Sequence, residues 1–277
     1  MPGAEPAEVP AVTVVIPTRG RPELVREAVE GVVAQTYAGP VHCIVVHDQE
    51  APDQSLCELA TAGRTVTVLR NEGTTGLSGS RNFGLRGVTD DFVASCDDDD
   101  RWLPDKLDRQ MRRLLGDPAL WVVGAGIRLL MRREVFDRVG GYDERLPQSY
   151  AEDYEWLLRA SRLGPVGVVR EPLAEINKAS QSWFRERNEV VSEALRYVLA
   201  HHPEIAASRA GHARIMGQIA FAEASLGHRR EAMRWAGRSL ARWPFAPQAV
   251  LAMIQVVFAF DPRTLLRYAR LAGRGLA

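Results

Sequence analysis

The chain has 277 residues, of which 46% are hydrophobic and 25% charged, a composition typical of a globular protein and not of a disordered one. Lys+Arg and Asp+Glu both number 35, so the net charge does not indicate nucleic acid as a partner. Domains usually contain roughly 100–200 residues, so this length predicts one large domain with a smaller addition.

Strand-like and helix-like patterns alternate along the first part of the chain. Apolar, β-branched runs predict strands at Val12–Ile16, Val41–Val46, Thr65–Leu69 and Phe92–Ser95, with further apolar segments at 121–123 and 127–131. Helical spacing, or a proline at a helix start, predicts helices from Pro22, near 80–85, from Pro104, at 133–139 and at 151–163. Apolar strands separated by helices predict an α/β fold, with a mostly parallel sheet that helices cover on both faces.

Only helical patterns follow Lys178. Residues 226–244 resemble half of a tetratricopeptide repeat, but one repeat cannot form a solenoid because such units bury their faces by stacking. We therefore predict two domains, an α/β domain at 11–177 and a helical extension at 178–277 with one tetratricopeptide-like hairpin. The extension carries 15 Lys+Arg against 7 Asp+Glu, which fits either a solvated helix face or an approach to an anionic membrane or acceptor.

The cellular compartment is indicated by cysteine use and by apolar runs. Cys43, Cys57 and Cys96 are too few and too scattered for a disulfide framework or a zinc site, and they fit a reducing cytoplasm. Residues 1–10 show no signal-peptide pattern. The longest apolar run, at 249–260, is about 12 residues long, whereas ~20 are needed to span a bilayer. We expect a cytoplasmic protein with at most peripheral contact to the inner face of a membrane.

Four consecutive carboxylates, Asp97–Asp100, follow the strand predicted at Phe92–Ser95. They would repel one another unless a cation or hydrogen bonds compensated their charge. Open α/β sheets bind ligands at the carboxyl edge of their strands, and Mn²⁺ or Mg²⁺ takes carboxylate and diphosphate oxygens. This acidic tetrad therefore predicts a metal-dependent nucleotide-diphosphate site, with a solvated acidic loop or an Asp-rich helix N-terminus as the alternatives.

Six segments in a fixed order resemble the family 2 glycosyltransferases over about residues 11–175. They are residues 15–24, Val45–Asp48, Asn71–Asn82, the acidic tetrad, Gly140–Glu144 and Glu152–Trp156. The resemblance implies a GT-A-type nucleotide-diphospho-sugar transferase fold. It also implies an inverting transfer of a sugar from a nucleotide-diphosphate sugar donor to a hydroxyl of a glycan or lipid-linked acceptor, in surface or extracellular glycan synthesis.

The resemblance further implies roles for single residues on the donor side. Pro17, Thr18 and Arg19 lie in the loop that contacts the nucleotide, Arg81 neutralises or positions the nucleotide, and Asp48 lies beside the position of the acidic residue that reads the base. His47-Asp48 stands where the family usually has Asp-Asp, which leaves the identity of the nucleobase open. In the Asp-x-Asp region, Asp97 and Asp98 contact the nucleotide sugar, with Asp98 at the ribose, and Asp99 binds Mn²⁺ or Mg²⁺.

Asp153 occupies the position of the family's catalytic base. It lies in the first turn of a predicted helix, where the helix dipole favours the ionised carboxylate that takes a proton from an acceptor hydroxyl. Helix-capping acidity is the alternative interpretation. Glu152 and Trp156 are weaker candidates for acceptor contact. For Trp156 a core position is the alternative, because aromatic residues at helical spacing are more often core. Gly140-Gly141-Tyr142 is either a turn that approaches the ligands or a helix C-cap.

Two other functions stay open. A sugar nucleotidyltransferase relies on a Gly-rich loop with basic residues after its first strand, whereas the loop from Pro17 to Pro22 is shorter and ends in proline. A non-catalytic nucleotide-sugar-binding module that uses its helical tail for assembly would keep the fold without turnover. The intact acidic tetrad and Asp153 favour the enzyme.

Overall fold

A computed structural model describes residues 9–125, 128–176 and 187–258 of the chain. The chain divides into two compact units, Met1–Arg145 with Glu152–Ser180 and Leu146–Ala151 with Gln181–Ala277. The domain boundary predicted at 177–178 lies outside the described residues, as do the end of the apolar run at 249–260 and most of residues 1–10, so the two-domain division stays a prediction.

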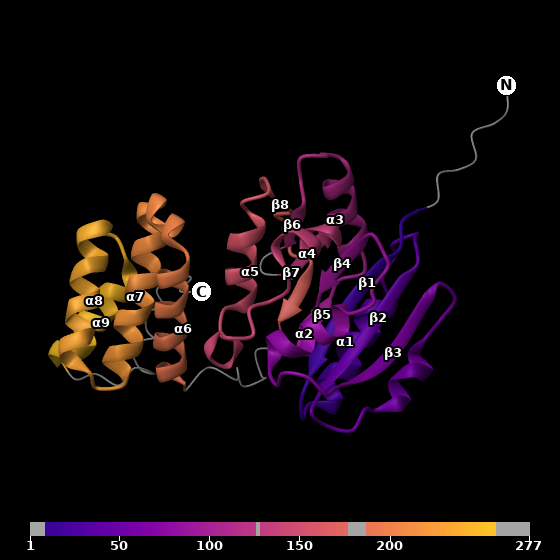
Figure 1. Ribbon diagram of the computed structural model, residues 1–277, viewed down its shortest axis with the longest axis horizontal. Helices are drawn as coiled ribbons and strands as arrows, with labels where there is room; N and C mark the ends of the chain where they lie inside the picture. Colours follow the sequence, from indigo (N-terminus) through magenta and orange to yellow (C-terminus); the bar gives the residue numbers. More distant parts are fainter. Residues whose placement is uncertain (1–8, 126–127, 177–186, 259–277) are drawn as a thin grey trace. The chain divides into compact units, whose positions relative to one another are not determined.

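A seven-stranded sheet in the order β3-β2-β1-β4-β7-β6-β8 forms the centre of the first unit (Figure 1). Four of its pairings are parallel, and β7 runs antiparallel to β4 and β6. A second sheet pairs β5 with β9. The strands are β1 Val12–Thr18, β2 Val41–Asp48, β3 Arg64–Asn71, β4 Phe92–Ser95, β5 Asp100–Trp102, β6 Val122–Ala125, β7 Arg128–Arg132, β8 Val166–Val168 and β9 Ala174–Ile176. The mostly parallel α/β fold is thereby confirmed.

The first strand is longer than the sequence predicted, because β1 continues through Pro17 to Thr18. It pairs with β4 only as far as Val15, so beyond that residue β2 is its single neighbour. Proline is tolerated where a strand has an unpaired side, since no ladder hydrogen bond is lost there. The strand predicted to end at Ile16 therefore extends two residues further.

Helices cover both faces of the sheet, as predicted. Phe92 and Ala94 of β4 pack with α1 and α3 in one apolar cluster, whereas Val93 between them packs with α4 and α5 in another. The helices of this unit are α1 Pro22–Val33, η1 Gln54–Leu59, α2 Leu77–Leu85, α3 Lys106–Leu115, α4 Glu134–Val139 and α5 Glu152–Ala160. The sequence missed η1 and the three-residue strands β5, β8 and β9, which are too short to show a period.

The second unit is helical throughout its described residues, which confirms the helical C-terminal region. Its helices are η2 Pro147–Ser149, α6 Asn188–His201, η3 Pro203–Ala207, α7 Arg209–Ser225, α8 Arg229–Arg242 and α9 Pro247–Phe258. Alanines pack α7, α8 and α9 together, among them Ala220, Ala236 and Ala249. The tetratricopeptide-like hairpin stays a prediction. Within the described part of the chain, no helix is both long enough and apolar enough to cross a membrane.

Candidate functional site

The carboxyl ends of three neighbouring strands bring the predicted donor residues to one edge of the sheet. Thr18 ends β1 and is in register with His47 of β2, while the acidic tetrad follows β4 on the other side of β1. Carboxyl ends of parallel strands are where open α/β sheets bind ligands. Pro17 and Thr18 are both buried at this edge, so their side chains shape the loop rather than extend into solvent.

Asp98 ties the loop after β1 to the tetrad. It is buried, Thr18 Oγ1 donates to its Oδ2 at 2.9 Å, and Arg21 Nη1 donates to its Oδ1 at 2.9 Å. Burial raises the pKa of this carboxyl, and Arg21 acts in the opposite direction. Arg21 also lies 3.5 Å from Asp99 Oδ2. Sequence reasoning gave no role to Arg21, because the partners lie 77 residues apart.

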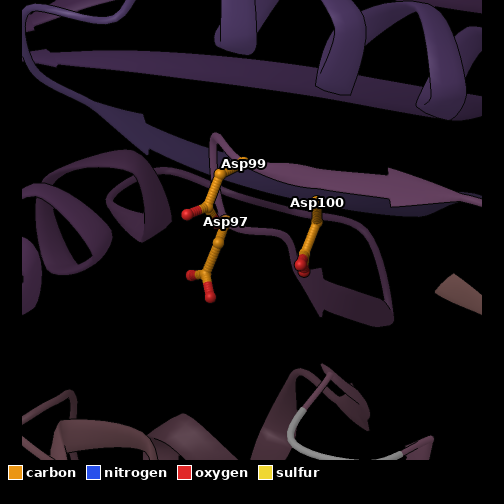
Figure 2. A group of neighbouring side chains, drawn as sticks. All are labelled: Asp97, Asp99 and Asp100. Atoms are coloured by element: carbon orange, nitrogen blue, oxygen red, sulfur yellow. The ribbon is translucent and has the colours of Figure 1, made fainter. Parts of the chain in front are cut away.

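Three carboxylates of the tetrad lie close enough to share a cation. One oxygen from each of Asp97, Asp99 and Asp100 falls within 4.8 Å of the others, in the turn after β4 and at the first residue of β5 (Figure 2). Asp100 is buried and both of its oxygens accept from Arg128, Oδ2 from Nε at 2.7 Å and Oδ1 from Nη2. Asp97 and Asp99 are partly exposed, and oxygen donors suit Mg²⁺ and Mn²⁺. These two residues therefore fit a hard divalent cation better than Asp100 does.

Arg81 is a buried cation between the tetrad and the start of α5. Its Nη2 lies 2.5 Å from Asp97 Oδ1, its Nη1 donates to Glu152 Oε1, and its Cζ lies 5.2 Å from the centre of the Tyr142 ring. Burial by itself would lower the pKa of Arg81, but the carboxylates of Glu152 and Asp97 outweigh burial and raise it. The guanidinium is thus held in its charged form among acidic groups.

Glu152 and Asp153 begin α5 and differ in their surroundings. Glu152 is buried, and burial raises its pKa to about 8 in spite of Arg81. Asp153 is partly exposed and accepts a hydrogen bond from the backbone N–H of Tyr154 at 2.7 Å. Burial raises the pKa of Asp153, with Arg81 acting in the opposite direction. Burial is the largest influence on this pKa and opposes the ionisation that the helix terminus was expected to favour.

Asp48 organises the loop between β3 and α2. Its Oδ1 accepts from Asn71 Nδ2 at 3.1 Å and from Ser80 Oγ at 3.2 Å, and its Oδ2 accepts from the backbone N–H of Gly76 at 3.1 Å. Arg19 Nη1 lies 3.4 Å from the same Oδ2. Asp48 is buried, so these bonds compensate its lost hydration and fix Arg19 next to the loop.

His47, which stands where the family usually has aspartate, is bound to the loop after β2. It is buried, its Nδ1 lies 3.4 Å from Glu50 Oε1, and its Nε2 accepts from the backbone N–H of Asp53 at 3.3 Å. Because Nε2 accepts, Nδ1 carries the proton and donates to Glu50. Glu50 also accepts from the backbone N–H of Gly20 at 3.0 Å. No sequence pattern pointed to Glu50, which connects the loops after β1 and β2.

The Gly140-Gly141-Tyr142 turn is anchored to α2 by Asn82. Its Nδ2 donates to the carbonyl of Tyr142 at 2.9 Å, and its Oδ1 accepts from the N–H of Tyr142 at 2.8 Å. A Cβ atom on Gly141 would lie 2.4 Å from Asn82 Oδ1, so this position excludes a side chain. Gly140 has a φ of +79° and is the C-cap of α4. The C-cap interpretation is therefore confirmed for Gly140, while an approach of this turn to the ligands stays a prediction.

Trp156 and Glu152 do not present acceptor-binding faces. Trp156 is fully buried, packs against Phe136 and Tyr142, and donates from Nε1 to the carbonyl of Gly140 at 3.1 Å. Its indole therefore offers no face for sugar stacking, and the suggestion of acceptor contact is corrected to a core role. Glu152 is buried against Arg81, which suits a positioning role.

Comparison with known proteins gives curated relatives of part of the chain. A sequence of 113 residues is 26% identical to UDP-Glc:alpha-D-GlcNAc-diphosphoundecaprenol beta-1,3-glucosyltransferase WfgD of Escherichia coli, covering 41% of this chain and 44% of that one. A stretch of 103 residues is 40% identical to the succinoglycan biosynthesis protein ExoW of Rhizobium meliloti. It covers 35% of this chain and 31% of that protein. The chain thus spans less than half the length of these relatives.

Solved structures share the fold over nearly the whole chain. The mannosyltransferase PcManGT from Pyrobaculum calidifontis, in complex with GDP-Man and Mn²⁺, superposes with a TM-score of 0.62 at 16% identity, covering 98% of this chain and 90% of that one. S. aureus TarS 1–349 in complex with UDP-GlcNAc gives a TM-score of 0.54 at 15% identity. The match covers 96% of this chain and 93% of that one. At this level of identity the likeness is one of fold, which confirms the GT-A-type architecture.

The sequence model of glycosyl transferase family 2 matches residues 13–152, just over half of the chain. The match includes the loop after β1, Asp48, Arg81 and the whole acidic tetrad, and it ends at Glu152. The chain therefore belongs to glycosyl transferase family 2.

Proposed function

We propose that the protein is a metal-dependent, inverting glycosyltransferase that moves a sugar from a nucleotide-diphosphate sugar to an acceptor hydroxyl. The observation that carries this proposal is the pair of contacts made by Arg81. This buried cation contacts Asp97 of the acidic tetrad and Glu152, the residue before Asp153. Arg81 thereby connects the acidic tetrad, which suits the donor, to the start of α5, which carries the candidate base Asp153.

The donor side of the proposed site is the edge formed by β1, β2 and β4. We assign nucleotide contacts to Pro17, Thr18, Arg19, Asp48, Arg81, Asp97 and Asp98. Support comes from the shared hydrogen bonds of Asp98 and Asp48, which hold the loops after β1 and β3 in one arrangement. Arg19 is largely exposed, so its guanidinium is accessible to a diphosphate.

We assign Mn²⁺ or Mg²⁺ to Asp99, together with the oxygen of Asp97 that does not face Arg81. Their oxygen donors and partial exposure support this assignment, while Asp100 is taken up by Arg128. When bound, the cation supplies charge neutralisation for the departing diphosphate. Arg21 and Arg81 hold the surrounding carboxylates in position, which limits the repulsion within the tetrad.

Asp153 is the proposed general base. Its carboxylate takes the proton of the acceptor hydroxyl as that oxygen forms a bond to the anomeric carbon, and the bond from that carbon to the diphosphate breaks on the opposite side. No sugar–enzyme bond forms, so the anomeric configuration inverts. A raised pKa makes the ionised carboxylate a stronger base, which supports the assignment.

For the acceptor we propose a glycan or a lipid-linked saccharide used in surface or extracellular polysaccharide synthesis. The support is the names of the relatives, one a glucosyltransferase acting on GlcNAc-diphosphoundecaprenol and one a succinoglycan biosynthesis protein. We further propose that residues 11–177 form the transferase domain, that 178–277 form the helical extension, and that the enzyme works in the cytoplasm at the inner face of the membrane. Three cysteines without a disulfide support that compartment.

Two readouts test this function. The protein is incubated with UDP-, GDP- and dTDP-sugars and a saccharide acceptor, with Mn²⁺ or with EDTA, and nucleoside diphosphate release is measured. The anomeric configuration of the product is read by NMR. We expect release with one donor only, dependent on metal and with inversion. Tight donor binding without release or transfer would instead support the non-catalytic binding module.

A further inference from the structure

The last described helix, α9, carries no charged residue on any of its faces. Its 12 residues are Pro-Gln-Ala-Val-Leu-Ala-Met-Ile-Gln-Val-Val-Phe, which corresponds to a length of about 18 Å. Ala249, Ala252 and Gln255 are buried where α9 packs within the helical unit. A helix that packs on one face of a water-soluble unit usually has polar residues on the other, and α9 does not.

The opposite face of α9 presents large apolar side chains. Val250, Val257 and Phe258, which we call the α9 face, are exposed, with Val257 at 61% and Phe258 at 64%. Trp243 and Phe245 are exposed in the turn before α9, where their rings meet edge to face with centroids 6.0 Å apart. Apolar side chains grouped on one element in this way mark an interaction site rather than scattered surface residues.

The sequence that contains this apolar helix is rich in arginine. The segment 229–258 contains five arginines and one acidic residue, Glu231. Arg229 Nη2 donates to the carbonyl of Val256 at 2.9 Å, so one of these cations lies at the C-terminal end of α9, next to the α9 face. Arg230, Arg234 and Arg238 are exposed along α8 at helical spacing. Apolar side chains flanked by arginines are typical of protein segments that lie in the interface of an anionic bilayer.

We propose that the α9 face, with Trp243 and Phe245, docks onto an anionic lipid bilayer, with the α8 arginines contacting lipid headgroups. Charge favours this occupant over a second copy of the chain, because self-association would bring together two copies of a segment with five arginines and one acidic residue. Residues 259–277 add four arginines and one aspartate, so they strengthen the attraction to anionic lipid. The inference deepens the proposed peripheral membrane contact by naming the surface and the lipid charge.

Flotation of the full chain with lipid vesicles tests the docking surface. Phosphatidylcholine vesicles with and without phosphatidylglycerol are used, in the absence of donor and metal. The protein should float with the anionic vesicles and dissociate as NaCl is raised. Val257→Glu or Phe258→Glu should weaken association about tenfold or more, and Arg230→Gln about fivefold. Because the assay needs no donor, its failure would not bear on the transferase activity.

The matched control is Val168→Glu, which adds the same charge at a valine that is 58% exposed on β8 in the other unit. It should float like the wild type, and circular dichroism should show all variants folded. A wild-type chain that does not float at low salt overturns the proposal, whether residues 259–277 or a second copy covers the α9 face. Unchanged flotation of both Val257→Glu and Phe258→Glu overturns it as well.

Discussion

The guanidinium of Arg81 is buried against the carboxyl group of Glu152, one residue before the proposed base Asp153. The same guanidinium contacts Asp97 at 2.5 Å, in the acidic cluster after β4. One side chain on α2 therefore couples the tetrad to the first turn of α5. Two elements far apart in the sequence are held together at the point where donor and acceptor would meet.

Replacing Asp153 by Asn should remove catalysis while sparing donor binding. The amide keeps the shape of the side chain but cannot take a proton, so kcat should fall by about 10²–10⁴-fold. Donor affinity, measured by calorimetry with Mn²⁺, should stay within about twofold of the wild type. Asp137→Asn on α4, which alters an exposed carboxyl, is the control and should keep full activity. Near-wild-type turnover of Asp153→Asn would show that the base lies elsewhere.

Asp99 and Asp100 are neighbours in the chain with different expected roles. Asp99→Ala should abolish the metal-dependent part of donor binding without much change in stability. Asp100→Asn should destabilise the fold, by about 3–5 kcal/mol, because Arg128 would lose a charged partner inside the protein. Urea denaturation and donor calorimetry on both variants separate the two effects. The assignment fails if the two variants exchange these phenotypes.

Glu152 should make stability depend on pH in a specific direction. Its pKa is raised from 4.5 to about 8 in the folded protein, so folding favours the protonated carboxyl. The contribution is complete below pH 4.5 and is lost as the pH rises through about 8, at up to ~1.4 kcal/mol per pH unit. Glu152→Gln should therefore flatten the loss of stability across this range. Urea midpoints measured against pH for both proteins give the difference, and a steeper slope in the variant would contradict the assignment.

Gly79 allows the loop after β3 to pack on α2. A Cβ atom there would lie 1.8 Å from the carbonyl oxygen of Thr74, a backbone atom that cannot rotate away. Gly79→Ala should therefore cost about 1–3 kcal/mol and weaken donor binding. Gly237→Ala on α8 is the matched control, since nothing lies within 4 Å of its Cβ position. The control should gain about 0.5–1 kcal/mol, and a Gly79→Ala protein as stable as the wild type would refute the packing argument.

The sequence predicted the features that depend on local patterns. The strand at Phe92–Ser95 has the predicted bounds, and the tetrad follows it at the sheet edge. The ion pairs that organise the site were not predictable, because Arg21 and Asp98 lie 77 residues apart and Arg81 and Glu152 lie 71 apart. No periodicity encodes which distant side chains meet. The raised pKa of Asp153 was missed for the same reason, since burial depends on packing that brings distant segments together.

Binding of a nucleotide-diphosphate sugar to the acidic tetrad through a divalent cation should be visible in the thermal stability of the protein. The melting temperature is measured with UDP-, GDP- and dTDP-sugars, each with and without Mn²⁺, for the wild type and for Asp99→Ala. We expect a rise in Tm for one donor that requires Mn²⁺ and is lost in Asp99→Ala. No rise with any donor, or an equal rise without metal and in the variant, would contradict it.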